Sequence, residues 1–173
     1  MIQLSYQPAF DPFHTAFRVL RLLPMIRAVG HLYRDHVRIL DFYLLFPFRV
    51  EGVRLAQKHR RFRSLAQSLE SQKPYGEQPD DSVLFARMEP IQHAALETLA
   101  DKGFIDVGEW RAGYVAPTDQ TLAEELRDRV DAANVSEANL VELITTLALE
   151  YELLGRNGLK DRTGLLEHRY DAV

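Results

Sequence analysis

Residues 99–117 read LADKGFIDVGEWRAGYVAP, and this stretch decides the fold that we predict. A helix that ends in Asp-Lys-Gly is followed at once by the largely apolar residues 104–107. Glycine is common after the last helical turn because it adopts a left-handed backbone conformation without strain. Residues 114–116 are apolar again, and the six residues before them begin and end with glycine. The pattern predicts a β-hairpin over residues 104–117, directly after a helix.

Three helices precede the predicted hairpin. Apolar residues recur at helical spacing over residues 32–46, 58–70 and 90–102. Three helices closed by a hairpin that covers their core follow the order of a winged helix. We therefore predict a mainly α fold, with a winged-helix-like domain, one small β-hairpin and additional flanking helices. An unrelated helical bundle with one hairpin is the alternative.

The apolar residues of this unit predict its core. Residues 32–46 are apolar nearly all round the helix, which indicates a helix buried from several sides. The side chains that we expect to be largely buried come from this helix, from the next long helix and from the first strand: Phe42, Leu45, Phe46, Leu96, Leu99 and Phe104.

Prolines predict several helix boundaries. Asp11, followed by a proline, favours a helix start at that point. We expect Pro24 to kink or end this first helix, because the proline ring clashes with the preceding turn. Pro90 predicts a boundary between a short helix over residues 82–88 and the helix that follows it.

The chain then divides into three predicted parts. These are an N-terminal helical arm over residues 1–30, the winged-helix-like domain over 31–120 and a C-terminal helical extension over 121–173. The extension opens with Thr121 and Glu124, which have the spacing of a capping box and predict a helix start.

Composition limits the class of protein. The chain has 173 residues, of which 46% are apolar and 27% are charged, as in ordinary globular proteins. Cysteine is absent, which excludes a disulfide framework and a thiolate nucleophile and indicates a reducing, cytoplasmic setting. The longest apolar stretch, residues 39–50, is too short and too charged to span a bilayer, so we expect no membrane association.

The net charge of −4 conceals an asymmetry between two halves of the chain. Residues 1–73 carry 12 Lys and Arg against 5 Asp and Glu, whereas residues 74–173 carry 9 against 20. The asymmetry favours an acidic or polyanionic partner near the first half and a basic partner near the second. The alternative, that the halves pack together and neutralise each other, stays open.

The basic residues of the first half include a candidate partner or nucleic-acid surface: Arg49, Arg54, Lys58, Arg60, Arg61 and Arg63. We expect the last three to face solvent or a partner rather than an internal acid. Direct DNA contact stays open, because a solvated, partner-facing helix explains a charge run equally well. The helix over residues 90–102, which a winged helix would place in the major groove, carries Glu97 and Asp101 against Lys102. That is a poor surface for phosphates.

Catalytic chemistry has weak candidates only. His31 and His36, and a helical face formed by Glu89, His93 and Glu97, are the best metal-ligand patterns, and a solvated helix face accounts for the second better than a metal does. The glycines are dispersed, so the sequence has no phosphate-binding loop. We expect a protein that is not an enzyme and that has no cofactor and no metal.

The last long predicted helix, residues 136–154, is a candidate association helix. Apolar residues along it are spaced alternately by four and three, as in a coiled coil. The residues of this surface are Leu140, Leu143, Ile144, Leu147, Tyr151 and Leu154. A second copy or a partner chain would cover them, and docking onto the helix's own domain is the alternative.

Three short blocks resemble a known protein family. They are residues 6–14, YQPAFDPFH, residues 38–47, RILDFYLLFP, and residues 85–92, FARMEPIQ. Together they resemble the small middle component of bacterial ABC-three-component conflict systems, over roughly residues 4–125.

This resemblance implies a non-enzymatic winged-helix protein. It would be encoded with an SMC-like ABC ATPase and a separate effector, as in Lamassu-like anti-phage systems. Such a protein would be an adaptor subunit that bridges the ATPase and the effector, with a homodimer left open. The alternative is a winged-helix DNA-binding transcriptional regulator.

Overall fold

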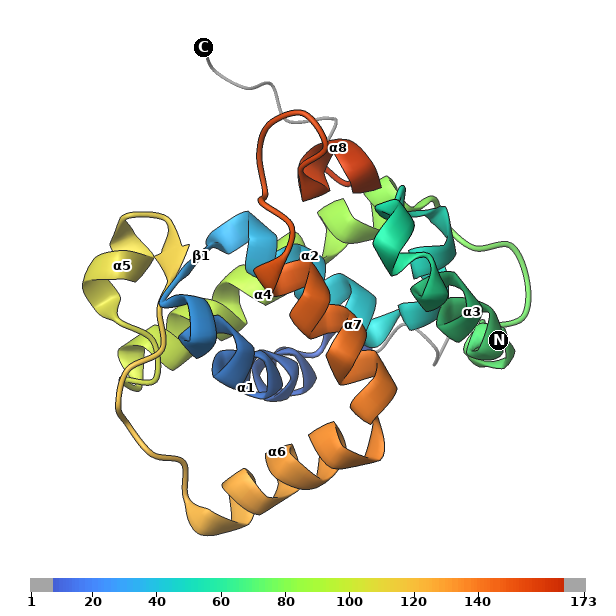
Figure 1. Ribbon diagram of the computed structural model, residues 1–173. Coiled ribbons are helices and arrows are strands. Elements are labelled where there is room, and N and C mark those ends of the chain that lie inside the picture. Colours follow the sequence, from blue (N-terminus) through green and yellow to red (C-terminus); the bar gives the residue numbers. More distant parts are fainter. Residues whose placement is uncertain (1–7, 167–173) are drawn as a thin grey trace.

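The computed structural model describes residues 8–166. The chain is mainly helical, as predicted, with one small two-stranded sheet (Figure 1). The α-helices are α1 (Pro12–Val29), α2 (Arg34–Leu45), α3 (Arg61–Ser68), α4 (Asp81–Asp101), α5 (Val107–Arg111), α6 (Glu124–Ser136), α7 (Ala138–Leu149) and α8 (Leu159–Thr163). The strands are β1 (Leu32–Tyr33) and β2 (Tyr114–Val115), and 3-10 turns cover Pro47–Gly52, Gln57–His59 and Glu70–Gln72.

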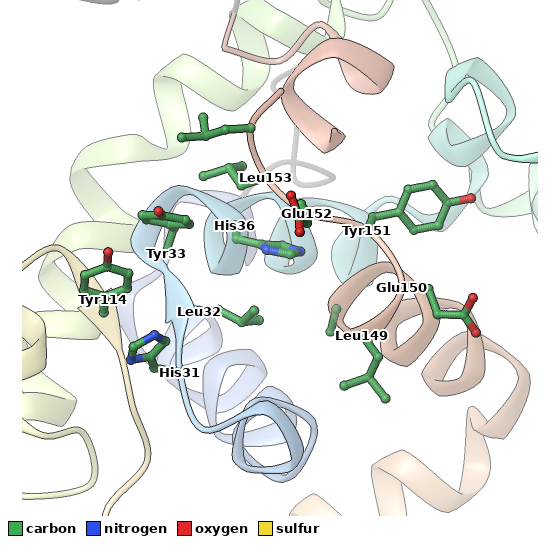
Figure 2. A pocket seen from close by; sticks show the side chains of 12 residues that line it. His31, Leu32, Tyr33, His36, Tyr114, Leu149, Glu150, Tyr151, Glu152 and Leu153 are labelled. Carbon is green, nitrogen blue, oxygen red and sulfur yellow. The ribbon is translucent and has the colours of Figure 1, made fainter. Parts of the chain in front are cut away.

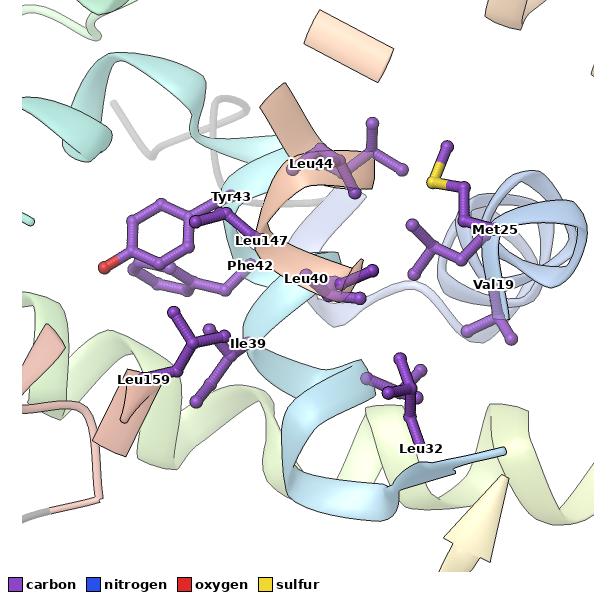
Figure 3. Close-up of a cluster of buried hydrophobic side chains, with 14 of the residues drawn as sticks. Val19, Met25, Leu32, Ile39, Leu40, Phe42, Tyr43, Leu44, Leu147 and Leu159 are labelled. Atoms are coloured by element: carbon purple, nitrogen blue, oxygen red, sulfur yellow. The ribbon is translucent and has the colours of Figure 1, made fainter. Parts of the chain in front are cut away.

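Helix α2 lies at the centre of the fold. Its residues from His36 to Leu44 are all buried, which confirms the prediction of a helix covered from several sides. Helices α1 and α7 pack against α2 (Figure 3). Helix α4 packs mainly along α1. One cluster of buried apolar side chains includes residues from Ala9 to Leu166 and so draws on all three predicted parts of the chain.

Aromatic rings fill the end of this core near the C-terminus of α2. The ring of Phe42 meets those of Tyr43, Phe46 and Phe85 edge-on, with centroids 5.2–5.8 Å apart. Of the predicted core residues, four are buried: Phe42, Phe46, Leu96 and Leu99. The other two, Leu45 and Phe104, are half-buried and pack against the same cluster.

The sheet differs from the predicted hairpin. Strand β2 pairs antiparallel with β1, with Leu32 opposite Val115, rather than with residues 104–107. Ile105 forms a single bridge to Pro117 instead of a strand. The reason is Asp106, whose side chain accepts a hydrogen bond from the Glu109 amide and so starts α5 where the turn was expected.

Both internal prolines lie inside continuous helices, so the predicted boundary at Pro90 and the predicted helix end at Pro24 are wrong. Helix α1 continues past Pro24 to Val29, and Pro90 lies within the 21-residue α4. A proline inside a helix costs about 3 kcal/mol through its missing amide and its clash with the preceding turn. The long contact between α1 and α4 offsets this cost, because it buries one face of each helix on both sides of its proline. The predicted start at Asp11 is confirmed, since its carboxylate accepts from two amides of the first turn.

The C-terminal helices are shorter than predicted. Helix α6 begins at Glu124, with no side-chain cap, so the predicted opening at Thr121 is wrong. Helix α7 ends at Leu149, and the predicted helix to residue 154 is wrong in its last turn. Residues 150–158 instead turn back on themselves, and a Cβ at Gly158 would lie 2.4 Å from the carbonyl oxygen of Leu154. Only glycine therefore fits at position 158 of this turn, which leads the chain into α8.

Candidate partner-binding surfaces

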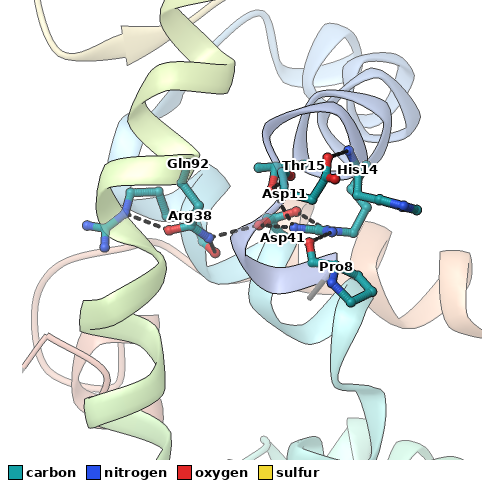
Figure 4. Close-up of polar contacts among 8 residues, drawn as sticks. Pro8, Asp11, His14, Thr15, Arg38, Asp41 and Gln92 are labelled. Atoms are coloured by element: carbon teal, nitrogen blue, oxygen red, sulfur yellow. Dashed lines mark hydrogen bonds and ion pairs between the residues drawn. The ribbon is translucent and has the colours of Figure 1, made fainter. Parts of the chain in front are cut away.

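A buried polar network joins α1, α2 and α4 (Figure 4). The Asp41 carboxylate accepts from Arg18 Nε at 2.6 Å and from Arg18 Nη2 at 3.2 Å. It also accepts from Gln92 Nε2 at 2.8 Å. Arg18 donates further to Thr15 Oγ1 and to the carbonyl oxygen of Pro8. Buried charges are tolerated when they are paired and hydrogen-bonded in this way.

The network continues to a second arginine. Arg38, whose side chain is almost fully buried, donates from Nε to Gln92 Oε1 at 3.0 Å and from Nη1 to Asp35 at 2.7 Å. Its Nη2 pairs with Glu89 at 3.4 Å, and its guanidinium lies over the ring of Phe85. The carboxylate of Glu89 is therefore an ion-pair partner of Arg38. The network positions helices, and the carboxylates of Asp35 and Glu89, which are 25% and 34% exposed, lie at its edge.

The histidines of the predicted metal patterns also have other contacts. His31 Nδ1 lies 3.0 Å from Glu109, and His36 Nε2 lies 3.0 Å from the Leu147 carbonyl oxygen. Burial lowers the pKa of His36, so its ring stays neutral and donates to that carbonyl. The ring of His93 packs edge-on against Trp110. Within residues 8–166 no three His, Asp or Glu side chains come together as a metal site.

The predicted basic surface is largely neutralised by the acidic half of the chain. Arg49 is turned inward and pairs with Asp81, so it does not belong to an exposed basic surface. The other ion pairs join exposed residues: Arg54 with Asp161, Lys58 with Glu150 and Arg61 with Glu142. These pairs support the alternative in which the two halves neutralise each other.

Two residues of the basic set differ from the rest. Arg60 and Arg63 are exposed, and neither forms an ion pair with any residue of the described part of the chain. Arg61 is also exposed, and its partner Glu142 is a surface acid on α7 rather than an internal one. The prediction that residues 60, 61 and 63 face outward is therefore consistent with their positions.

The side chains of the predicted association helix face inward. Leu140, Leu143, Ile144 and Leu147 are buried against α2 and its neighbours. Tyr151 lies beyond the helix and is buried as well. Its hydroxyl is hydrogen-bonded to His59 Nδ1 at 2.7 Å and accepts a hydrogen bond from the Ala56 amide. Docking onto the helix's own domain thus accounts for this stripe, because one apolar face of a surface helix normally covers the core. Of the six residues, only Leu154 is exposed.

A groove runs between β1 and the end of α7 (Figure 2). We call it the β1–α7 groove; it has a volume of about 590 Å³. It is lined by His31, Leu32, Tyr33, His36, Tyr114 and residues 148–154. Large apolar side chains stand exposed along it, namely Leu149, Leu154 and Tyr33. Exposed apolar side chains that gather in a depression mark interaction sites.

Aromatic rings form one wall of this groove. The ring of Tyr114 stacks on His31 at 4.5 Å and contacts Tyr33 at 4.9 Å. The opposite wall is the last turn of α7 and the segment after it, with Glu150 and Glu152 among the lining residues. None of the residues that line the groove is Lys or Arg.

A second groove lies between α3 and the junction of α6 and α7. We call it the α3–α7 groove; it measures about 420 Å³ and is lined by Pro47, Leu65, Ser68, Leu69, Gln72 and residues 135–140. Val135 is 77% exposed at its edge. The two grooves share no residue.

Comparison with known proteins identifies the family. The family model for Middle Component 5 of the ABC-three component (ABC-3C) systems matches residues 4–171. The chain belongs to this family. No curated protein and no solved structure matches it. None of the helices in the described part of this middle component is long and apolar enough to cross a membrane.

The three sequence blocks that resemble middle components meet at the buried polar network. Pro8 and Asp11 come from the first block and hold the start of α1 and the guanidinium of Arg18. Arg38 and Asp41 come from the second block, and Gln92 from the third. These blocks therefore fix the packing of three helices in this middle component.

The β1–α7 groove was missed by sequence reasoning. Residues 31–36 of one wall and residues 148–154 of the other are more than 100 residues apart in the chain, and the packing of α2 against α7 brings them together. Of the predicted association residues, Tyr151 and Leu154 do line the groove, but we assigned them to a helix that was too long.

Proposed function

We propose that this middle component is a non-enzymatic adaptor. It bridges an SMC-like ABC ATPase and an effector within one ABC-three-component system of bacterial anti-phage defence, of the Lamassu-like kind. Membership of the Middle Component 5 family carries the proposal, because a middle component implies other proteins of the same system.

The arrangement of surfaces supports an adaptor. A protein that bridges two others needs two separate contact surfaces, and the β1–α7 and α3–α7 grooves share no residue. Each has exposed apolar side chains, Leu149 and Leu154 in the first and Val135 in the second. Exposed apolar side chains that gather in a groove mark protein–protein interaction sites.

The proposed body of the adaptor is winged-helix-like. In this proposal the three helices of the unit are α1, α2 and α4 rather than the predicted 32–46, 58–70 and 90–102, and its extended segments are β1, the bridge at Ile105 and β2. The α3 region and the segment after it form a long insertion between the second and third helices of the unit. Helix α5 occupies the place where a winged helix carries the turn of its wing.

The observations favour the adaptor over a DNA-binding regulator. On α4, which would enter the major groove, Gln92 is buried in the polar network, while Glu97 and Asp101 are exposed. Carboxylates on that face repel phosphates. Four of the six candidate basic residues are already paired with acids of the same chain.

Purified full-length protein separates the two functions. The adaptor predicts that the chain co-purifies with the ATPase and with the effector encoded beside it. It also predicts weak, sequence-independent binding to duplex DNA in fluorescence anisotropy. The regulator predicts tight duplex binding that falls linearly with the logarithm of salt concentration, with no complex with either protein. The second result would refute the proposal.

The outward basic residues give a further comparison. We propose that Arg60, Arg61 and Arg63 contribute to a partner contact, so R60E/R61E/R63E should weaken the complex with the ATPase or effector while leaving the chain folded. Surface ion pairs such as Arg61 with Glu142 are worth at most about 1 kcal/mol, so stability should change little. Unchanged complex formation and unchanged DNA affinity would make these residues an ordinary solvated face.

A further inference from the structure

The β1–α7 groove has an open strand edge along one side. The Arg34 amide donates to the Gly113 carbonyl oxygen, so this hydrogen bond lies next to the Tyr33–Tyr114 pair rather than within it. Hydrogen-bonded pairs of an antiparallel ladder alternate with pairs that are not hydrogen-bonded. Tyr33 and Tyr114 are the next pair, and their rings lie 4.9 Å apart, as side chains in a non-hydrogen-bonded pair do.

The amide N–H of Tyr33 therefore points away from β2. That side of β1 is the side of the β1–α7 groove, where residues 148–154 form the far wall (Figure 2). Outside the strand ladder, no acceptor within residues 8–166 accepts a hydrogen bond from this amide. An open edge donor of this kind is the attachment point for an added strand from another chain.

The chemistry of the groove restricts what fits beside the open edge. Leu32 lies on the β1 side of the groove with Leu149 across from it, and Leu149 is 45% exposed (Figure 2). Leu149 offers exposed apolar surface to a large apolar side chain, whereas Leu32 is 9% exposed and contributes only the edge of its side chain. Glu152 is exposed at the same wall with no ion pair among the described residues.

The end of α7 adds to the negative character of this wall. The last carbonyl groups of a helix carry the negative end of its dipole, and α7 ends at Leu149, inside the groove. Because no Lys or Arg lines the groove, these charges are not balanced from within it. A cationic side chain is the complementary group.

We infer that the β1–α7 groove binds an extended segment of a partner protein, which adds as a strand to the open edge of β1 and carries a large apolar side chain next to a Lys or Arg. The inference rests on the proposed adaptor function and names the chemistry of one of its two contacts. The apolar side chain lies between Leu32 and Leu149, and the cation lies near Glu152. The partner carbonyl accepts from the Tyr33 amide.

The experiment compares substitutions at exposed positions of the groove. The full-length chain is immobilised, and the co-encoded ATPase and effector are added separately in biolayer interferometry. Leu149→Lys and Glu152→Lys place positive charge where the segment is expected to bring its own, and each should weaken one of the two complexes at least tenfold. Val83→Lys is the matched control, because Val83 is 40% exposed and lines neither groove, whereas Val135→Lys, in the α3–α7 groove, should weaken only the other complex.

A pair of substitutions isolates the strand edge. Tyr33 has φ of −54°, which proline adopts without strain, so Tyr33→Pro removes the amide donor with little change of backbone. Tyr33→Ala removes the same ring and keeps the donor. The inference predicts that Tyr33→Pro weakens the complex at least tenfold more than Tyr33→Ala does. Circular dichroism and melting temperature of each variant confirm that it is folded.

The outcomes separate the inference from the function on which it rests. If the wild-type chain binds a partner but the groove variants bind equally well, or if only Val135→Lys loses binding, the inference is wrong and the adaptor stands. Equal affinities of Tyr33→Pro and Tyr33→Ala refute strand addition. If the wild-type chain binds neither protein, both fail. If it forms a dimer in sedimentation that Leu149→Lys dissociates, the occupant is a second copy and the partner segment is refuted.

Discussion

Replacing Asp41 with asparagine tests whether the buried polar network holds the three central helices together. The side chain keeps its shape but loses its negative charge, and one of its oxygens becomes an NH2 group. That group faces either Arg18 or the Gln92 amide, both of which donate to the carboxylate in the native protein. Arg18 is then left buried with no counter-ion. Breaking a buried ion pair in this way costs about 3–5 kcal/mol.

Urea unfolding followed by circular dichroism measures this loss. Total stability of a domain is about 5–15 kcal/mol, so D41N should lose a large fraction of it. For a chain of this size the same loss lowers the melting temperature by about 6–20 °C. D128N is the matched control, because Asp128 is exposed on α6 and meets only Arg127 at 3.7 Å. That control should change stability by less than about 1 kcal/mol.

A double substitution tests the physical reason. R18M/D41L removes both charges together, so no charge is left buried without a partner, and it should recover much of the stability that D41N loses. If D41N unfolds within about 1 kcal/mol of the wild-type chain, the network does not hold the helices in the way that its geometry indicates.

Three further substitutions test the core, the C-terminal return and the pH dependence. F42A should lose about 3–5 kcal/mol in urea unfolding, whereas F13A, at a side chain that is 85% exposed, should lose little, and equal losses would contradict the core assignment. Y151F should lose about 1–3 kcal/mol, because it leaves the Ala56 amide and His59 without their hydrogen-bond partner; an unchanged midpoint would mean that the return after α7 is not held there. His36 has a pKa below its ordinary value because it is buried, so the unfolded chain takes up a proton as pH falls through about 6.5 while the folded chain does not. The stability of the wild-type chain should therefore fall from pH 7.5 to pH 5.5. The stability of H36Q, which keeps a donor toward α7, should fall less over the same range. Parallel stability–pH profiles of the two chains would contradict a buried neutral ring.

Local sequence patterns predicted helices correctly where residues a few positions apart determine the structure. The continuous apolar character of residues 32–46 correctly predicted a buried central helix, and Asp11 correctly predicted the start of α1. Both features depend on residues a few positions apart. Pro24 and Pro90 were misread for the opposite reason, since the packing of α1 along α4 overrides a local cost of a few kcal/mol.

The pairing of the two strands could not be predicted from local sequence patterns. Tyr114 and Val115 were predicted to be extended, and they are, but their partner is Leu32 and Tyr33, about 80 residues earlier in the chain. Residues 104–106 of the expected first strand do pair with residues 116–118, through the Ile105–Pro117 bridge and two backbone hydrogen bonds, and α5 begins directly after them where Asp106 caps it. Strand pairing over such separations depends on the arrangement of the whole helical core, which no local pattern contains.

The candidate surfaces were predicted in part for a similar reason. Arg60 and Arg63 were correctly expected to face outward, but the partners of Arg49 and Lys58 lie far along the chain and neutralise them. The apolar spacing over residues 140–147 is the same whether a helix covers its own core or another protein. Only the position of α7 in the fold distinguishes the two.

Assembly of the three proteins tests the adaptor most directly. The ATPase and the effector are purified separately and mixed with and without the middle component, and the masses of the complexes are measured by size-exclusion chromatography with light scattering. The account predicts that the ATPase and the effector elute together only when the middle component is present, in a complex that contains all three. An ATPase–effector complex that forms equally well without it would contradict the account.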